Sequence, residues 1–138
     1  PRRELFPVTG QSTNAPTSPA LGLKIICAYM PYSASASQII YITNPSNRAT
    51  DIKLKGYDET GAMWDLGTIT TADGRKVTKL STLVFDKLQA LGFTAGKLTL
   101  EFDCDNPEIM GYFSYNAGSV RGFVRSIREL YVLPPVTP

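Results

Sequence analysis

The chain has 138 residues, a net charge of +2 and no histidine. Its length fits one domain, and its 43% of apolar residues suffice for a core without disulfides or metals. The small net charge argues against nucleic acid as a partner, and no apolar run approaches the roughly 20 residues of a membrane span. Without histidine, no Ser-His-Asp or Cys-His arrangement can form within the chain. We therefore predict a non-enzymatic protein with no catalytic, cofactor or metal site.

Prolines separate a folded body from two ends. They stand at Pro1, Pro7, Pro16 and Pro19 in the first stretch and at Pro134, Pro135 and Pro138 in the last. Such segments are extended and poor in self-structure. We expect an extended N-terminal arm at residues 1–20, a domain at 21–133 and a C-terminal tail at 134–138. The large apolar residues Leu5, Phe6 and Val8 of the arm suit a groove or a sheet edge.

Short β-strands with turns between them fill the next part of the chain. Apolar and alternating patterns predict strands near residues 23–30, 38–43, 51–57, 63–70 and 76–80. Asn44-Pro45-Ser46-Asn47 is a strong turn signal. Strands of this length and spacing are typical of a sandwich or barrel.

A short helix is predicted near residues 82–91. Val84, Leu88 and Leu91 follow helical spacing, and Ser81 or Thr82 can cap the start. Strands are then predicted at residues 98–104, where the alternation is clearest, at 108–116 and at about 122–133. Together these elements predict an all-β fold, a single antiparallel β-sandwich of seven to nine strands with one short helix.

Part of the chain, about Ile42–Phe123, resembles a β-sandwich module recurrent in secreted bacterial proteins. The matching motifs are Thr43-Asn44-Pro45-Ser46, Gly56-Tyr57-Asp58-Glu59-Thr60-Gly61, Leu80-Ser81, Gly92-Phe93-Thr94-Ala95-Gly96-Lys97-Leu98-Thr99-Leu100-Glu101 and Ile109-Met110-Gly111-Tyr112. The resemblance implies an immunoglobulin- or fibronectin-like fold that is usually non-catalytic and extracellular or on the cell surface. The motifs are turn and core positions, so they carry no functional residue over to this chain.

Cys27 and Cys104 fall on strand faces that the pattern predicts to be buried. A disulfide between two distant strands would suit an extracellular protein, to which the resemblance points. The alternative is two separate buried thiols that behave as small apolar residues.

Carboxylates gather at one turn, which holds Asp103, Asp105, Asn106 and Glu108. Oxygen ligands this close together can hold Ca²⁺, although Asp-Asn-Pro is also a good turn in its own right. The same carboxylates, with Asp58 and Glu59, are candidates for a glycosidase pair. Turn solubility explains them more simply.

Aromatic residues offer a candidate glycan platform. Tyr32, Tyr41, Tyr57 and Trp64 stand beside turns or on strand faces that can be wet. The alternative is ordinary packing in the core or at an edge.

The preferred interpretation is an extracellular or cell-surface structural protein that assembles with copies of itself. Residues around Leu5–Val8 of one copy would add to a sheet edge or groove of the next, by strand addition or arm exchange. A contact of this kind that closes gives a ring, and one that does not close gives a surface fibre or filament. The main alternative is a carbohydrate-binding or adhesive module that recognises a glycan or another cell-surface component. A small hydrolase would need a pocket with two converging carboxylates.

Overall fold

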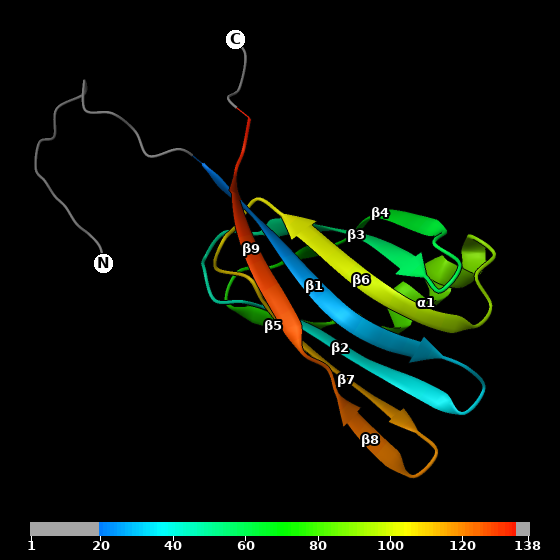
Figure 1. Ribbon diagram of the computed structural model, residues 1–138. Helices are drawn as coiled ribbons and strands as arrows, with labels where there is room; N and C mark the ends of the chain where they lie inside the picture. The colour runs from blue at the N-terminus through cyan, green and yellow to red at the C-terminus, as the bar shows by residue number, and fades with distance from the viewer. Residues whose placement is uncertain (1–19, 135–138) are drawn as a thin grey trace, which may run out of the picture.

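The computed structural model describes residues 20–134, which form nine β-strands and one short helix (Figure 1). The strands are β1 (Leu21–Tyr32), β2 (Ala36–Asn44), β3 (Thr50–Asp58), β4 (Met63–Ala72), β5 (Lys76–Lys79), β6 (Gly96–Cys104), β7 (Met110–Ala117), β8 (Val120–Phe123) and β9 (Ser126–Val132). The helix α1 (Ser81–Ala90) lies between β5 and β6 in the sequence. The predicted arm residues Leu5, Phe6 and Val8 lie outside the described residues.

The strands build two antiparallel sheets. The five-stranded sheet has the order β4-β3-β6-β1-β9, and the four-stranded sheet has the order β5-β2-β7-β8. This confirms the predicted all-β sandwich of seven to nine strands with one short helix. The immunoglobulin-like topology that the resemblance implies stays a prediction.

Alternating side chains fill the space between the sheets. In β6, Leu98, Leu100 and Phe102 are at most 2% exposed, as the alternation predicted. Phe102 stacks on Phe113 of β7 with ring centroids 5.4 Å apart, so this aromatic pair joins the two sheets. Burying one such side chain contributes about 1.5–3 kcal/mol, which makes this core the main source of stability.

The helix α1 packs against β2 and β4. Val84 and Leu88 are buried as predicted, whereas Leu91 follows the helix and is 48% exposed. Neither predicted capping residue caps α1, because the helix begins after Leu80 without a side-chain cap. The Ser81 hydroxyl instead accepts a hydrogen bond from the Ile40 N–H (2.9 Å), which fixes the helix to β2.

The predicted final stretch at 122–133 is two strands that belong to different sheets. β8 pairs with β7, whereas β9 pairs with β1. Val124 and Arg125 carry the chain between them. The Val124 N–H donates to the Phe113 carbonyl (3.1 Å), and the Arg125 carbonyl accepts from the Ala28 N–H (3.4 Å). Because this stretch pairs first with β7 and then with β1, buried and exposed side chains do not alternate regularly along it.

Two buried asparagines tie the loops together at one end of the sandwich. The Asn44 amide donates to the carbonyls of Arg48 (2.7 Å) and Ala72 (3.0 Å). Its Oδ1 accepts from the Ser46 N–H (3.1 Å) and the Ser46 hydroxyl (2.7 Å). All four hydrogen-bonding positions of this buried amide are therefore filled.

The second asparagine, Asn106, shares Ser46 with the first. Its amide donates to the hydroxyls of Ser46 (2.9 Å) and Thr50 (3.0 Å), and its Oδ1 accepts from the Glu108 N–H (3.0 Å). We call Asn44, Ser46 and Asn106 the Asn–Ser–Asn network. It connects the β2–β3 loop to the end of β4 and to the turn before β7.

Replacing Asn44 by alanine should lower the free energy of unfolding by about 3 kcal/mol, because two carbonyls and the Ser46 groups lose their buried partner. Asn47→Ala is the matched control, since Asn47 lies in the same loop but is exposed. Urea unfolding followed by circular dichroism measures both. Equal stability of the two variants would contradict a structural role of the network.

Candidate functional site

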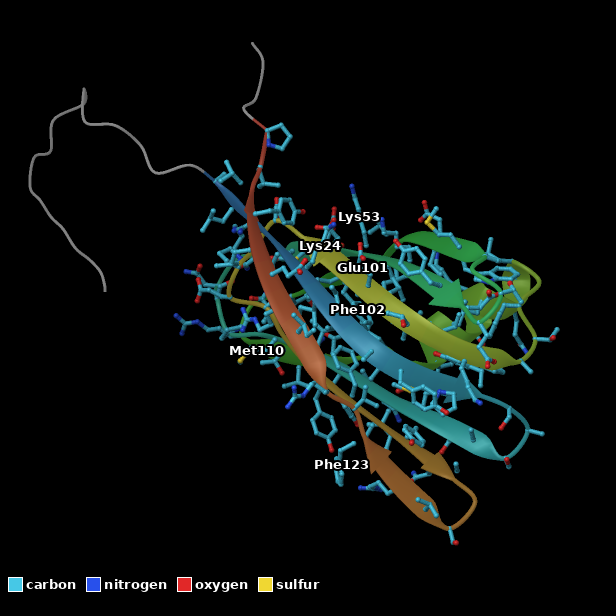
Figure 2. The ribbon with its side chains drawn as sticks, in the orientation of Figure 1. Lys24, Lys53, Glu101, Phe102, Met110 and Phe123 are labelled. Carbon is cyan, nitrogen blue, oxygen red and sulfur yellow. The ribbon has the colours of Figure 1, made fainter. Side chains whose placement is uncertain are left out.

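The outer face of the five-stranded sheet carries paired charges. Glu101 on β6 lies between Lys24 on β1 and Lys55 on β3, with N–O distances of 3.7 and 3.4 Å. Glu101 raises the pKa of the Lys55 amine, since its negative charge favours the protonated form. Figure 2 shows Lys24, Lys53 and Glu101 together on this side. The face is a solvated surface whose charges compensate one another.

The outer face of the four-stranded sheet carries several large apolar side chains among polar ones such as Lys79 and Arg121. Ile40 and Ile42 of β2 are buried, so the residues between and beside them point outward. The registers place apolar side chains from all four strands on this outward side: Ile39, Tyr41, Val77, Met110, Tyr112 and Phe123. Met110 and Phe123 lie away from the charged face in Figure 2. We call these six residues the apolar outer face.

One side of the sandwich has protected edges. The edge strand β4 contains two bulges, where Leu66 and Ile69 have no partner in β3, and Gly67 between them has a φ of 65°. The edge strand β5 has four residues and a lysine at each end, Lys76 and Lys79. Bulges, short strands and lysines all hinder pairing with another chain.

On the opposite side of the sandwich β8 is also short, but the edge strand β9 has no bulge and no lysine. There β9 pairs with β1 over seven consecutive residues without a register shift, and within residues 20–134 no strand pairs with its other edge. Its side chains Leu130 and Val132 lie on the face that points toward the other sheet, and both are exposed. Exposed apolar side chains on a regular edge strand are a typical site for addition of a further strand.

An open strand position lies next to β9. β8 pairs only with Ser114–Ala117 of β7, and the chain then crosses to the other sheet. The start of β7, Met110–Tyr112, thus has no paired strand on that side within the described residues. We define the open strand position by this edge of β7 and by Leu130 of β9, which faces it. Its side chains Leu130 and Met110 are both exposed.

In the structure Cys27 and Cys104 are not bonded to each other, which argues against the disulfide alternative. Cys27 lies opposite Leu100 and Cys104 lies opposite Leu23, which places them four residues apart along adjacent strands. That separation is about 13 Å, whereas a disulfide requires Cα atoms within about 7 Å. This geometry favours the alternative of two separate thiols. Burial raises the pKa of Cys27 to about 12 and also raises the pKa of Cys104.

The predicted glycan platform is not assembled. Tyr32 is buried against Phe93, and Tyr41 lies on the other sheet from Tyr57 and Trp64. Tyr57 points outward from β3, whereas Trp64 pairs with the buried Gly56 and therefore points toward the core. The four side chains share no surface.

Trp64 is instead part of a turn. Its indole N–H donates to Asp58 Oδ2 (3.0 Å), while Asp58 Oδ1 accepts from the Thr60 hydroxyl (2.6 Å) and the N–H groups of Thr60 and Ala62 (2.8 and 3.0 Å). The hydrogen bonds from Thr60 and Trp64 lower the pKa of Asp58 to about 2. Asp58 thus organises the β3–β4 turn.

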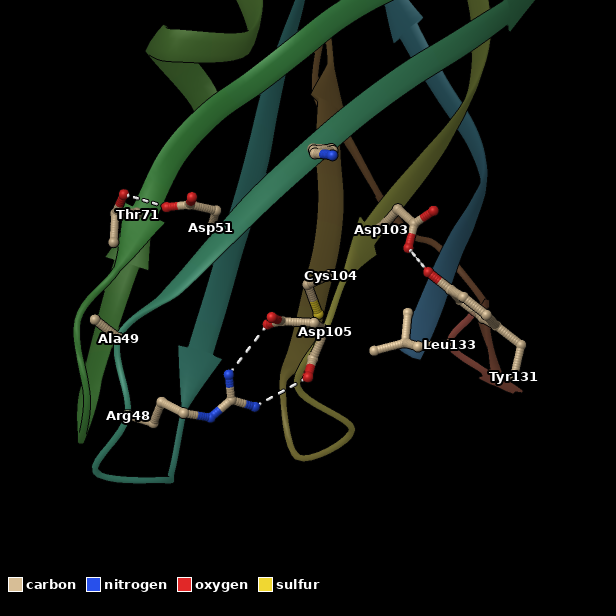
Figure 3. Close-up of a pocket in the computed structure, with 10 residues that line it drawn as sticks. Arg48, Ala49, Asp51, Thr71, Asp103, Cys104, Asp105, Tyr131 and Leu133 are labelled. Atoms are coloured by element: carbon tan, nitrogen blue, oxygen red, sulfur yellow. Dashed lines mark hydrogen bonds and ion pairs between the residues drawn. The ribbon is translucent and has the colours of Figure 1, made fainter. Parts of the chain in front are cut away.

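Figure 3 shows a polar pocket at the end of the five-stranded sheet, where the carboxylates are already engaged. Asp51 accepts a hydrogen bond from the Thr71 hydroxyl (2.6 Å). Asp103 accepts one from the Tyr131 hydroxyl. Burial, followed by the bond to Asp103, raises the pKa of Tyr131. These pairings favour a structural reading of the pocket over a catalytic one.

The acidic turn at residues 103–108 also serves the fold. Asp105 pairs with Arg48 at 3.1 Å, and the Asp105 carbonyl accepts a second bond from the same guanidinium (2.9 Å). Asn106 points inward as part of the Asn–Ser–Asn network. Among residues 20–134, no three Asp, Glu, Cys or His side chains are placed to hold a metal ion.

Comparison with protein families identifies the chain. The family model for the S-layer protein Slr4 matches residues 20–120, which is most of the chain. The chain belongs to the S-layer protein Slr4 family. It is thus an extracellular structural protein of the cell surface. No curated protein and no solved structure matches it.

The S-layer family match agrees with the cell-surface part of the sequence-based resemblance. The match covers every strand from β1 to β7 and the start of β8, so it includes the β7 edge of the open strand position. None of the described helical segments has the length and apolar character that a membrane span needs.

Sequence reasoning missed the apolar outer face and the open strand position. A signal for the former was present, because Ile39-Ile40-Tyr41-Ile42 is apolar on both strand faces. Met110 and Tyr112 similarly alternate with the inward Gly111 and Phe113. The open strand position had no such signal, since it depends on where β8 leaves its sheet.

Titration with a thiol reagent in denaturant, without reductant, should detect two thiols per chain, because both cysteines are free. The folded protein should react far more slowly at pH 8, since burial disfavours the thiolate. Reductant should leave the melting temperature unchanged. Detection of no thiols in the unreduced, denatured chain would contradict this assignment.

The depressed pKa of Asp58 predicts an acid-sensitive turn. The ionised carboxylate contributes stability above its ordinary value of 3.8, and this contribution is lost as pH falls through about 2. Asp58→Asn should therefore lower the melting temperature at pH 7 and reduce the loss of stability between pH 4 and pH 2. Thermal unfolding across this range measures both effects. Asp86→Asn, an exposed change on α1, should behave like the unmodified chain.

Proposed function

We propose that this chain is a non-catalytic subunit of a surface layer that associates with copies of itself through its N-terminal arm. Leu5, Phe6 and Val8 of one copy would pair with an exposed sheet edge of the next, by strand addition or arm exchange. Membership of the S-layer protein Slr4 family supports copies of itself as the partner.

The observation that carries the proposal is the difference between the two sides of the sandwich. β4 is bulged and β5 is short with a lysine at each end, whereas β9 is regular and exposes the apolar side chains Leu130 and Val132. A monomer that remains alone in solution gains nothing from one unprotected side, because such an edge promotes aggregation. A subunit that assembles through that side requires it.

The two other candidate functions receive less support. Carbohydrate binding needs aromatic side chains on one exposed surface, whereas Tyr32 and Trp64 pack inside on Phe93 and Tyr41 and Tyr57 lie on different sheets. Hydrolysis needs free carboxylates that converge, and Asp51, Asp103 and Asp105 each have a partner of their own.

Removal of residues 1–19 tests the role of the arm. Ala20 is retained because its carbonyl accepts a hydrogen bond from the Leu133 N–H (2.9 Å). The shortened chain should remain folded but lose self-association, raising the concentration needed for assembly about tenfold or more. Analytical ultracentrifugation and electron microscopy measure assembly, and circular dichroism verifies the fold.

Two full-length variants refine this test. Changing Leu5, Phe6 and Val8 together to serine should reproduce the deletion, since the apolar contacts are lost while the length is kept. Changing Ser12, Thr13 and Asn14 to alanine is the control, and it should assemble normally. Assemblies of unchanged size after the deletion would rule out a role for the arm.

A further inference from the structure

The open strand position presents unpaired backbone groups on β7. The Phe113 carbonyl accepts from the Val124 N–H, so the Phe113 backbone groups point toward the β8 side. Hydrogen-bonding directions alternate along a strand, and β7 pairs with β2 without a register shift. The N–H and C=O of Gly111, two residues earlier, therefore point the same way. There, within residues 20–134, β8 no longer runs beside β7.

The inner face of β9 is also uncovered, at Leu130, two residues from the Arg128 that pairs with Ile25. Leu130 lies opposite Leu23, so both side chains point toward the space between the sheets. Leu23 is fully buried, yet Leu130 is 59% exposed, because the four-stranded sheet has no strand beneath it. A side chain that faces inward and stays exposed marks a missing layer of the sandwich.

The two halves of the position lie across from each other. A Cβ on Gly111 would lie 3.5 Å from Ile25 Cγ2, and Ile25 pairs directly with Arg128 of β9. The Arg128 guanidinium donates to the Pro107 carbonyl (2.6 Å), which links β9 to the turn before β7. The edge of β7 and the inner face of β9 are thus held in place before any strand is added.

We propose that Leu5–Val8 of a second copy adds to this position as a strand beside β7, an inference that rests on the proposed self-association through the arm. Phe6 and Val8 lie two residues apart, so the backbone N–H and C=O groups of both can point toward β7 at Gly111. The side chains of both residues then face inward, over Leu130. The nitrogen of Pro7 then points to the outer edge, where a missing N–H costs no ladder bond.

A second copy is the occupant that the chain path favours. The bond from Leu133 to Ala20 continues the β1–β9 ladder to the first described residue, so the chain reaches Ala20 while still paired to β9. Val8 and Ala20 are twelve positions apart in the sequence, so the chain between them can span about 40 Å when extended. That length is sufficient for the arm to reach a second copy packed against this side of the sandwich. Self-association through the arm likewise requires the receiving site to lie on another copy.

Leu130→Asp tests the position without touching the arm. The exposed Leu130 tolerates aspartate in the free subunit, but a charge beneath the added strand should raise the concentration needed for assembly about tenfold or more. Ile127→Asp is the matched control on the same strand. Ile127 is 51% exposed but pairs with the outward-facing Ile26, so assembly should persist.

The results separate this inference from the proposed function. If the arm deletion and Leu130→Asp both abolish assembly, while Ile127→Asp does not, the inference is supported. If only the arm deletion abolishes assembly, the arm binds elsewhere and the inference fails, although the proposed function stands. If the arm deletion has no effect, both fail.

Cross-linking identifies the occupant. A chain carrying Phe6→Cys is mixed with one carrying Leu130→Cys, and oxidation should give a disulfide-linked dimer of the two. Phe6→Cys mixed with Ile127→Cys is the control and should not link. A chain carrying both Phe6→Cys and Leu130→Cys that closes only within itself, at any dilution, would overturn the assignment to a second copy.

Discussion

The Asn–Ser–Asn network holds the two sheets together at the end where the chain forms loops rather than strands. Asn44 ends β2 in one sheet and bonds to Ala72, which ends β4 in the other. Asn106 joins the same network from the turn that precedes β7. A buried amide left without partners costs about 1–3 kcal/mol, so these bonds form together or not at all. The start of β7, and with it the edge at Gly111, is therefore fixed by buried hydrogen bonds.

This fixed edge matters because the chain leaves the four-stranded sheet early. β8 has only four residues before Val124 and Arg125 cross to β9. The crossing completes the five-stranded sheet, but it leaves the start of β7 without a paired strand. Bulges and lysines protect the opposite side of the sandwich. One crossing thus explains both the uncovered inner face of β9 and the unpaired backbone of β7.

The sequence predicted what local patterns determine and missed what depends on contacts between distant segments. Alternation in residues 98–104 predicted β6 and its buried face, and helical spacing predicted α1. The cysteine pairing depended on the register of β1 against β6, which a single strand does not encode. The same holds for the aromatic residues, since Tyr41 and Tyr57 were assigned to one surface before their sheets were known. The open strand position exists only because β8 stops at Phe123, before it reaches the start of β7 at Met110.

Addition of the arm would also limit its own growth. Each subunit has one arm and one open position, which makes the contact heterologous, so it builds a ring or a continuing row rather than a closed pair. Pro7 at the new outer edge lacks the N–H that a further strand would need, so the four-stranded sheet gains one strand and stops. Subunits would then be joined by a single defined strand each.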